Sequence, residues 1–280
     1  MLDKKIIICS TIRNVEKDLE NFFKKIDEIT LNFQEYFIIL VQSNSNDNTI
    51  IEANKYLSSR RGTLINKDLD INLYRTERLE TCRNEYLNYI RNYKILSNYD
   101  YLLVMDADSM NNSLKFKSLE KSINSEINWN AIFANQRFIY YDIWTLRIKN
   151  YIEFDCFQKI KKESIDKKNL KNIFYNFFTY FFYLNKHFKE RFIKVDSAFG
   201  GLGIYKLKKV LEFTYDSKMG AQCEHVGINE KLNKKYGNLY IDRKLVNSSG
   251  LSKHSINGLL CGKSNYFARR FLSIINKTVR

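Results

Sequence analysis

A chain of 280 residues, 44% of them hydrophobic, is long enough to bury the core of one large α/β domain, and this composition excludes general disorder. The formal net charge of +15, from 46 Lys and Arg against 31 Asp and Glu, favours an anionic partner. It does not choose among nucleic acid, an acidic membrane surface and a phosphorylated substrate. The absence of Pro with abundant Lys, Asn and Ile is also typical of an AT-rich genome, which supplies lysine without a functional cause.

Cysteine usage and the N-terminus indicate the compartment. The five cysteines are odd in number and lack C-x-x-C spacing, so the sequence predicts neither a disulfide framework nor a zinc knuckle. The apolar run near the N-terminus ends before Ser10, which is too short for a signal-peptide core. No stretch reaches the roughly 18 apolar residues of a membrane-spanning helix. We therefore expect a cytoplasmic protein.

The first half of the chain alternates between apolar strands and helices. Short apolar runs predict four strands, at residues 6–9, 36–41, 71–74 and 101–105. Three amphipathic segments predict helices, at residues 16–29, from Ile50 to Leu57, and at 77–93. This alternation predicts a mostly parallel sheet with helices on both faces, whose ligands lie at the carboxyl ends of the strands. The second half is less regular, with one further strand expected at 131–134.

Two carboxylates follow the strand predicted at 101–105: Asp106 and Asp108, with Ala107 between them. In the turn beyond a strand both can converge on one cation, and their oxygen ligands suit Mg²⁺ or Mn²⁺. Such a cation would neutralise the charge that builds up on a departing nucleoside diphosphate. An Asp-x-Asp is also frequent in solvated surface turns, so the apolar strand before it is what favours a metal site.

Several segments taken together resemble the GT-A glycosyltransferases, notably family 2. The first set is residues 10–14, residues 42–49 and the strand that ends at Asp106-Ala107-Asp108. A second set is closer still to bacterial transferases related to the fungal capsule mannosyltransferases, and consists of Arg78 with Arg83-Asn84, residues 140–147 and residues 197–201. The resemblance implies an α/β GT-A fold, that is, a Rossmann-like, mostly parallel sheet with an irregular acceptor-binding half. It also implies a nucleotide-sugar donor and Mn²⁺ or Mg²⁺.

The resemblance implies which residues would contact the nucleotide-sugar donor. Thr11 and Arg13 would lie beside the nucleotide, Ser43 at the base or ribose, and Arg78 and Arg83 near the base or phosphate. Many family members have an acidic residue that reads uracil where this chain has Gln42 and Ser43, so the base stays open.

The resemblance also assigns the reacting end of the donor. Asp108 would be the principal metal ligand, and Asp106, a catalytic residue, would contact both ribose and metal. An inverting transferase needs a general base, for which Glu224 is the best candidate. His225 would complete the metal shell or hold the diphosphate. The alternatives are a structural, paired Glu224 and a core histidine; Asp142 and Asp196 are lesser base candidates.

The glycines at 200–203 lack the spacing of a dinucleotide fingerprint, so a tight acceptor-site loop is expected there. Aromatic residues upstream either stack on sugar rings or belong to the core: Tyr140, Tyr141 and Trp144, with Arg147 to hold anionic groups. Without repeats or linkers, we expect one GT-A catalytic domain at 1–263, divided into a nucleotide-sugar-binding half (1–145) and an acceptor half (146–263), then a basic amphipathic tail (264–280).

Two aromatic segments with basic neighbours suit a bilayer interface: residues 172–184 and the tail. They predict a peripheral contact with an anionic membrane on its inner face and a glycan or lipid-linked acceptor, as in the synthesis of a surface polysaccharide or lipooligosaccharide. Buried helices with a solvated basic face are the alternative.

Three other functions compete with sugar transfer. A sugar nucleotidyltransferase could use a similar sheet. A haloacid-dehalogenase-like phosphatase would use Asp106 as nucleophile, but such enzymes place that motif on their first strand. A basic nucleic-acid- or membrane-binding module would explain the charge but not the placement of Asp106 and Asp108. We expect no nucleic-acid partner.

Overall fold

The computed structural model describes residues 1–156, 158–159 and 179–248. Its strands are β1 (Leu2–Ile12), β2 (Phe33–Ser43), β3 (Gly62–Lys67), β4 (Tyr101–Met105), β5 (Ala131–Gln136), β6 (Phe192–Val195), β7 (Leu202–Lys206) and β8 (Leu239–Ser248). The α-helices are α1 (Glu16–Thr30), α2 (Thr49–Leu57), α3 (Arg75–Asn92), α4 (Phe116–Ile123), α7 (Tyr183–His187), α8 (Leu207–Val210) and α9 (Glu224–Tyr236). Two short 3-10 helices lie at Leu96–Asn98 and Ser109–Asn111.

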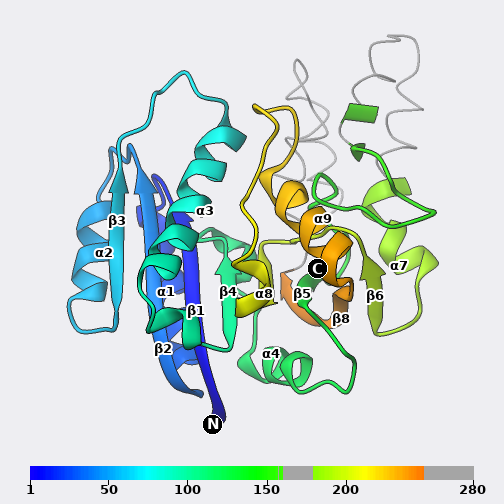
Figure 1. Cartoon of the computed structure of the whole chain (residues 1–280), viewed down its shortest axis with the longest axis horizontal. Coiled ribbons are helices and arrows are strands. Elements are labelled where there is room, and N and C mark those ends of the chain that lie inside the picture. Colours follow the sequence, from blue (N-terminus) through cyan, green and yellow to red (C-terminus); the bar gives the residue numbers. More distant parts are fainter. Residues whose placement is uncertain (157, 160–178, 249–280) are drawn as a thin grey trace, which may run out of the picture.

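The described strands form one eight-stranded sheet in the order β3-β2-β1-β4-β7-β5-β8-β6 (Figure 1). Parallel pairing joins β3, β2, β1 and β4, and also joins β5 to β8. The other two strands run antiparallel to their neighbours: β7 lies between β4 and β5, and β6 lies at the edge beside β8. The mostly parallel sheet that the sequence predicts is therefore confirmed.

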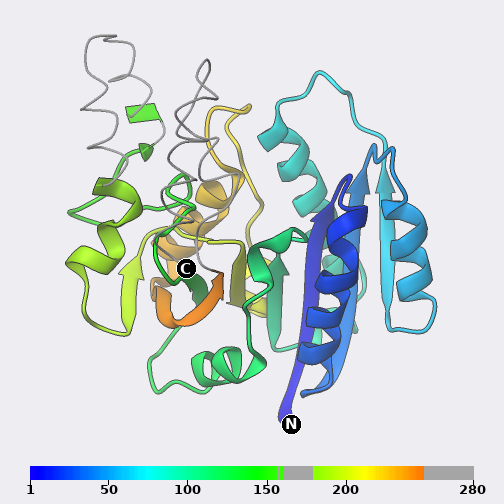
Figure 2. The ribbon, with the colours of Figure 1, turned by 180° about the vertical axis from the view of Figure 1, so that it is seen from behind.

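Both faces of the sheet are covered, which explains why its central strands are continuously apolar. In β1, Ile6 and Ile8 face a core shared with α1, α2 and α4. Their neighbours Ile7 and Cys9 face a second core shared with α3, α8 and α9. Accordingly α3, α8 and α9 lie in front of the sheet in Figure 1, and α1 lies in front of it in the reverse view of Figure 2.

The predicted helices at 16–29 and 77–93 are confirmed, as are the strands at 6–9, 36–41, 101–105 and 131–134. The strand predicted at 71–74 is wrong, because these residues form a loop in which Ile71 is 74% exposed. The third strand instead pairs with β2 from Gly62 onward. A Cβ at Gly62 would lie 2.5 Å from the Ile38 carbonyl oxygen, so glycine permits the close approach that begins this strand.

The predicted membrane segments are only partly described. Residues 172–178 and the tail at 264–280 lie outside the described residues. In the remainder of the aromatic segment, Tyr180, Phe181 and Leu184 are buried in the core that α3 and α9 share, so these three side chains pack inside the protein. Within the described ranges, no helix combines the length and apolarity needed to cross a bilayer.

Candidate active site

A cleft of about 740 Å³ opens where β1, β2 and β4 end. It is lined by Thr11 near the end of β1, Ser43 at the end of β2 and Asp106 directly after β4. This is the edge of a parallel sheet at which ligands bind in open α/β folds.

The cleft brings together the residues to which the sequence assigns catalysis, nucleotide contact or metal binding, whereas some of the lesser candidates lie outside it. Its lining includes the six candidate nucleotide contacts, the Asp108 carboxylate and the pair at the start of α9: Thr11, Arg13, Ser43, Arg78, Arg83, Asp106, Asp108, Glu224 and His225. They come from β1, β2, α3, the turn after β4 and α9, so residues far apart in sequence meet in one place. Their individual roles stay predictions.

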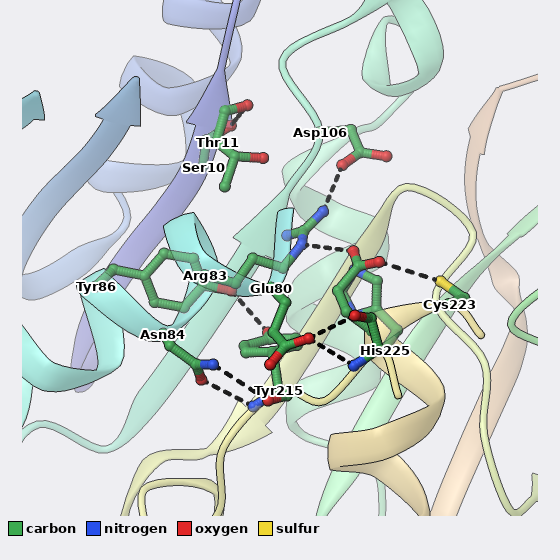
Figure 3. A network of polar contacts seen from close by, with 12 residues as sticks. Ser10, Thr11, Glu80, Arg83, Asn84, Tyr86, Asp106, Tyr215, Cys223 and His225 are labelled. Atoms are coloured by element: carbon green, nitrogen blue, oxygen red, sulfur yellow. Dashed lines mark hydrogen bonds and ion pairs between the residues drawn. The ribbon is translucent and has the colours of Figure 1, made fainter. Parts of the chain in front are cut away.

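Arg83 links the two carboxylates that the sequence proposes as catalytic. Its Nε donates to Glu224 Oε1 at 3.0 Å, and its Nη2 donates to Asp106 Oδ1 at 3.2 Å (Figure 3). The guanidinium also lies over the rings of Phe199 and Tyr215, with centroids at 5.2 and 5.8 Å. Its side chain is only 3% exposed, so its main contacts are with these side chains.

The electrostatics of Arg83 fit this central position. Burial opposes the charge, but the neighbouring Tyr86, Glu224 and Asp106 raise the pKa of Arg83 well above its usual value. Arg83 therefore stays a cation and offsets negative charge at both ends of the cleft. The direct contact with base or phosphate that the sequence suggests for Arg83 stays a prediction, and its Nη1 has no hydrogen-bond partner among the described residues.

Asp108 has no such counter-ion. Its side chain accepts a hydrogen bond from the Met110 backbone N at 3.0 Å, and no described Lys, Arg or His lies within ion-pair distance. Burial, followed by the nearby negative charge of Asp106, raises the pKa of Asp108 to about 7. A divalent cation at this pair would supply the missing positive charge, and the carboxylate oxygens are the donors that Mg²⁺ and Mn²⁺ prefer.

Asp106 and Asp108 thus fit a cation whose remaining ligands come from elsewhere. Across the described ranges, no three His, Cys, Asp or Glu side chains come together as a set able to hold a metal. The part expected of His225 in the metal shell stays a prediction.

His225 lies in an aromatic setting beside Glu224. Its ring stacks on Phe199 at a centroid distance of 3.7 Å and meets Tyr215 edge-on at 5.4 Å. Burial and the charge of Arg83 hold the pKa of His225 well below its usual value, so the imidazole is neutral. Neither ring nitrogen has a hydrogen-bond partner among the described residues. Buried nitrogens in this condition are rare, and a bound ligand or water would satisfy them.

The end of β2 is neutral in character. Ser43 lines the cleft together with Cys82, whereas the Gln42 side chain accepts a hydrogen bond from the Ser45 backbone N at 3.1 Å. The chain therefore has no carboxylate at the position where many family 2 members have one.

The turn that carries Asp106 and Asp108 is held by a buried amide network that sequence reasoning missed. Asn111 Nδ2 donates to the Asp106 carbonyl at 2.9 Å and to the Gly201 carbonyl at 3.0 Å. Asn247 Nδ2 donates to Asn111 Oδ1 and to the Gly200 carbonyl, and Gln136 Nε2 donates to Asn247 Oδ1 and to the same carbonyl. Pairs so far apart in sequence carry no local signal that could reveal them.

The glycine loop at 200–203 supports this turn. The Asp106 backbone N donates to the Gly201 carbonyl at 2.9 Å. Gly200 and Gly201 have φ of +65° and +80°, and a Cβ at Gly200 would lie 2.8 Å from the Ala134 carbonyl oxygen. Neither glycine lines the cleft, and the loop packs behind the carboxylate turn. Its predicted part in the acceptor site stays a prediction.

The aromatic residues at 140–147 divide between core and cleft. Tyr140 is buried and accepts a hydrogen bond from the Phe199 backbone N, whereas Tyr141 and Trp144 line the cleft. Arg147 is buried, donates to the Trp144 and Leu146 carbonyls and lies outside the cleft.

The lesser base candidates separate in the same way. Asp142 lines the cleft and accepts from the Gly200 backbone N at 3.0 Å, and burial raises its pKa to about 6 against the effect of that hydrogen bond. Asp196 lies outside the cleft and accepts from Asn233 Nδ2 at 2.7 Å.

No protein-family model and no curated protein sequence matches this chain. Solved structures do resemble it. The mannosyltransferase PcManGT from Pyrobaculum calidifontis, solved with GDP-Man and Mn²⁺, superposes with a TM-score of 0.53 at 12% identity over 90% of this chain and 59% of that one. S. aureus TarS 1–349 superposes with a TM-score of 0.50 at 10% identity over 85% of this chain and 57% of TarS.

This chain thus spans less than two thirds of the length of either structure. At such low identity the likeness concerns the path of the backbone and its arrangement of strands. Together with the mixed eight-stranded sheet, it shows that this chain has the GT-A fold.

Proposed function

We propose that this protein is a glycosyltransferase that moves a sugar from a nucleoside-diphosphate donor to a hydroxyl group of a glycan or lipid-linked acceptor. The observation that carries the proposal is the cleft itself, which places an Asp-x-Asp turn at the end of β4 and Glu224 at the start of α9 on either side of one buried guanidinium. PcManGT, which has a similar fold, was solved with GDP-Man and Mn²⁺.

In this proposal the two ends of the cleft have separate tasks. Asp106 and Asp108 would hold the divalent cation, which when bound supplies positive charge to the departing diphosphate. Thr11, Arg13 and Arg78 line the donor side, and Arg78 keeps most of its guanidinium free because it donates only to the Ile71 carbonyl, at 3.3 Å, among the described residues.

Glu224 would act at the other end as general base. It would take the proton from an acceptor hydroxyl as that oxygen forms a bond to the anomeric carbon, while the bond from the anomeric carbon to the diphosphate breaks and the diphosphate leaves with its electron pair. This in-line displacement inverts the anomeric carbon. The partnerless Nη1 of Arg83 and the two ring nitrogens of His225 would bind hydroxyl groups of the sugar substrates.

The proposal also covers the family relation, the pathway and the location of this protein. The likeness to bacterial relatives of the fungal capsule mannosyltransferases, the role in a surface polysaccharide or lipooligosaccharide and a peripheral contact of this cytoplasmic protein with an anionic membrane are parts of the proposal. Tyr141 and Trp144, which are half-buried and line the cleft, support a carbohydrate acceptor, because aromatic faces pack well on sugar rings.

The test is a panel of nucleotide sugars incubated with the protein and Mn²⁺, Mg²⁺ or a chelator, with the products identified by mass spectrometry. We expect metal-dependent release of a nucleoside diphosphate. Parallel incubations contain a nucleoside triphosphate with a sugar 1-phosphate, or a sugar phosphate alone. Release of pyrophosphate from the first mixture would instead indicate a nucleotidyltransferase, and release of inorganic phosphate from the second a phosphatase. Thermal stabilisation by DNA or by anionic vesicles, with none by nucleotides and metal, would indicate a binding module and contradict the proposal.

A further inference from the structure

The segment that leads into Glu224 has no regular secondary structure. Residues 211–222, here called the strap, connect α8 to α9 and run beside α3 in both views of the ribbon (Figures 1 and 2). Because α9 begins at Glu224, the position of this carboxylate depends on how the strap is held.

The strap is bound along its length by one face of α3. At the far end, Arg91 Nε donates to the Leu211 carbonyl at 2.9 Å and its Nη2 to the Phe213 carbonyl at 2.5 Å. Nearer the cleft, Asn84 Nδ2 donates to the Tyr215 carbonyl at 3.1 Å, and the Tyr215 backbone N donates to Asn84 Oδ1 at 2.9 Å. The Asn84 side chain therefore pairs with both the backbone N–H and the carbonyl of Tyr215, as the backbone of a neighbouring strand would.

Glu80 holds the last buried residue before the strap turns. The Ser217 backbone N and Oγ both donate to Glu80 Oε2, at 2.8 and 2.5 Å. Ser217 is fully buried, so without Glu80 both polar groups would lose a partner in the interior. Residues 80, 84 and 91 lie on one face of a helix, which is why a single extended segment can follow all three.

Beyond Ser217 the strap turns sharply towards α9. Lys218, Met219 and Gly220 have φ of +48°, +56° and +83°, which is an uncommon succession for two residues with side chains. The first turn of α9 then packs on the strap so closely that a Cβ at Gly227 would lie 2.3 Å from the Asp216 carbonyl oxygen.

The strap also supports the groups around Glu224 directly. The Tyr215 ring meets the His225 ring edge-on and lies beneath the Arg83 guanidinium, and the Tyr215 hydroxyl accepts from the Tyr86 hydroxyl at 2.7 Å (Figure 3). Moving Tyr215 would therefore shift both Arg83 and the start of α9.

We propose that Asn84 and Glu80 are positioning residues that fix Glu224 through the strap, and that α3 thereby joins the donor side of the cleft to the base. The proposal rests on the proposed sugar transfer for its kinetic consequence. The same helix carries Arg75 and Arg78 into the donor side of the cleft, so one rigid element spans both ends of the reaction. Neither Asn84 nor Glu80 lines the cleft, so neither need touch the substrates.

The kinetic test is a double-mutant cycle with Asn84→Ala and Glu224→Gln. We expect Asn84→Ala to lower kcat for transfer about tenfold or more with little change in KM for the donor, because a small displacement of a base is costly. In the Glu224→Gln background the same change should have no further effect on kcat. An equal loss in both backgrounds, or no loss in the wild-type background, would overturn the proposal. Asn92→Ala, an exposed change at the end of α3, is the matched control.

A second readout needs no activity. Cys223 directly precedes Glu224 and is buried, so its alkylation by iodoacetamide, located by peptide mass spectrometry, reports whether the end of the strap is held. We expect labelling of Cys223 to become several-fold faster in Asn84→Ala and in Glu80→Gln, with the buried Cys156 unchanged as an internal control. Unchanged labelling of Cys223 in both variants would overturn the proposal. If the wild-type protein transfers no sugar, the proposed function fails, and this labelling still decides whether α3 holds the strap.

Discussion

The two halves of the sheet contribute to the cleft in different ways. The parallel half, β3-β2-β1-β4, carries the donor-side residues at the last positions of its strands, in the turns that follow them and on α3. The mixed half, β7-β5-β8-β6, lines the cleft through the segments that connect its strands, which carry Tyr141, Trp144 and Glu224. It also supplies the backing for the carboxylate turn, from Gly200, Gly201, Gln136 and Asn247. The comparison teaches that the chemical groups are encoded locally, whereas their positions are set by contacts from far along the chain.

The largest expected effect tests the parallel half. Asp108→Asn removes the carboxylate that lacks a counter-ion, and we expect metal-dependent donor turnover to fall about a thousandfold or more. Turnover with saturating Mn²⁺ is the measurement, and Asp3→Asn, an exposed change in β1, is the control. Full activity of Asp108→Asn would mean that the locally encoded motif is not the metal site.

The same residue predicts how stability depends on pH. The folded-state pKa of Asp108, about 7, lies above its usual 3.8, so folding favours the protonated form. Its stabilising contribution is complete below about pH 4 and is lost as pH rises through 7. At pH 8, without metal, we expect Asp108→Asn to be more stable than wild type by about 2 to 3 kcal/mol, and at pH 4 to differ little. Chemical denaturation at both pH values is the measurement; equal stability at pH 8 would contradict the prediction.

A buried amide tests the backing from the mixed half. Asn247→Leu removes the hydrogen bonds to Asn111, Gln136 and Gly200, and we expect it to cost about 2 to 3 kcal/mol of unfolding free energy. It should also lower kcat about tenfold, although Asn247 does not line the cleft.

The matched control for that change is Asn130→Leu. Asn130 is equally buried and donates to the Tyr236 and Gly237 carbonyls, but it lies at the opposite end of β5 from Gln136. It should lose stability to a similar extent while the folded protein keeps its kcat. A parallel loss of kcat in both variants would show that the backing is not specific to the amide network.

The smallest expected effect compares two glycines with similar backbone conformations. Gly200→Ala meets the Ala134 carbonyl and Gln136, whereas Gly237→Ala, at φ +60°, meets nothing within 4 Å. We expect a loss of about 2 to 3 kcal/mol for the first and about 1 kcal/mol for the second, because only the first adds steric conflict to the conformational cost. Denaturant midpoints measure both, and equal losses would remove the argument for close packing behind Asp106.

The sequence predicts the parallel half well because its signals are local. The apolar run before Asp106 and the amphipathic pattern of α3 each indicate an element without reference to the rest of the chain. The third strand is the exception. The apolar residues around Ile71 predict a strand there, but the strand that pairs with β2 begins at Gly62, where the absence of a side chain permits the close approach. In the mixed half, β7 inserts between β4 and β5 by pairing with residues far away along the chain, such as Met105 with Leu202 and Phe133 with Gly203, which no local pattern reveals.

In the candidate site, too, the sequence identifies the candidate functional residues but not the contacts between them. Glu224 and His225 were identified by their residue types and by resemblance, and the structure brings them to the cleft. Their partners could not be predicted, because the Arg83 bridge joins α3 to α9 and the Asn84 contacts join α3 to the strap across long stretches of chain. Arg75 was missed because the predicted helix began two residues too late to include it.

The insertion of β7 between β4 and β5 also bears on the order of folding. As the chain leaves the ribosome, β1, β2, β3 and β4 can pair with one another while the second half is still being made. The carboxylate turn at the end of β4 has no backing until residues 200–201 arrive and no complete amide network until residue 247. We therefore expect a refolding intermediate that has the parallel strands but binds neither nucleotide nor metal. It should gain the ability to bind them only in a slower step, in which the distant residues of the second half pair with β4.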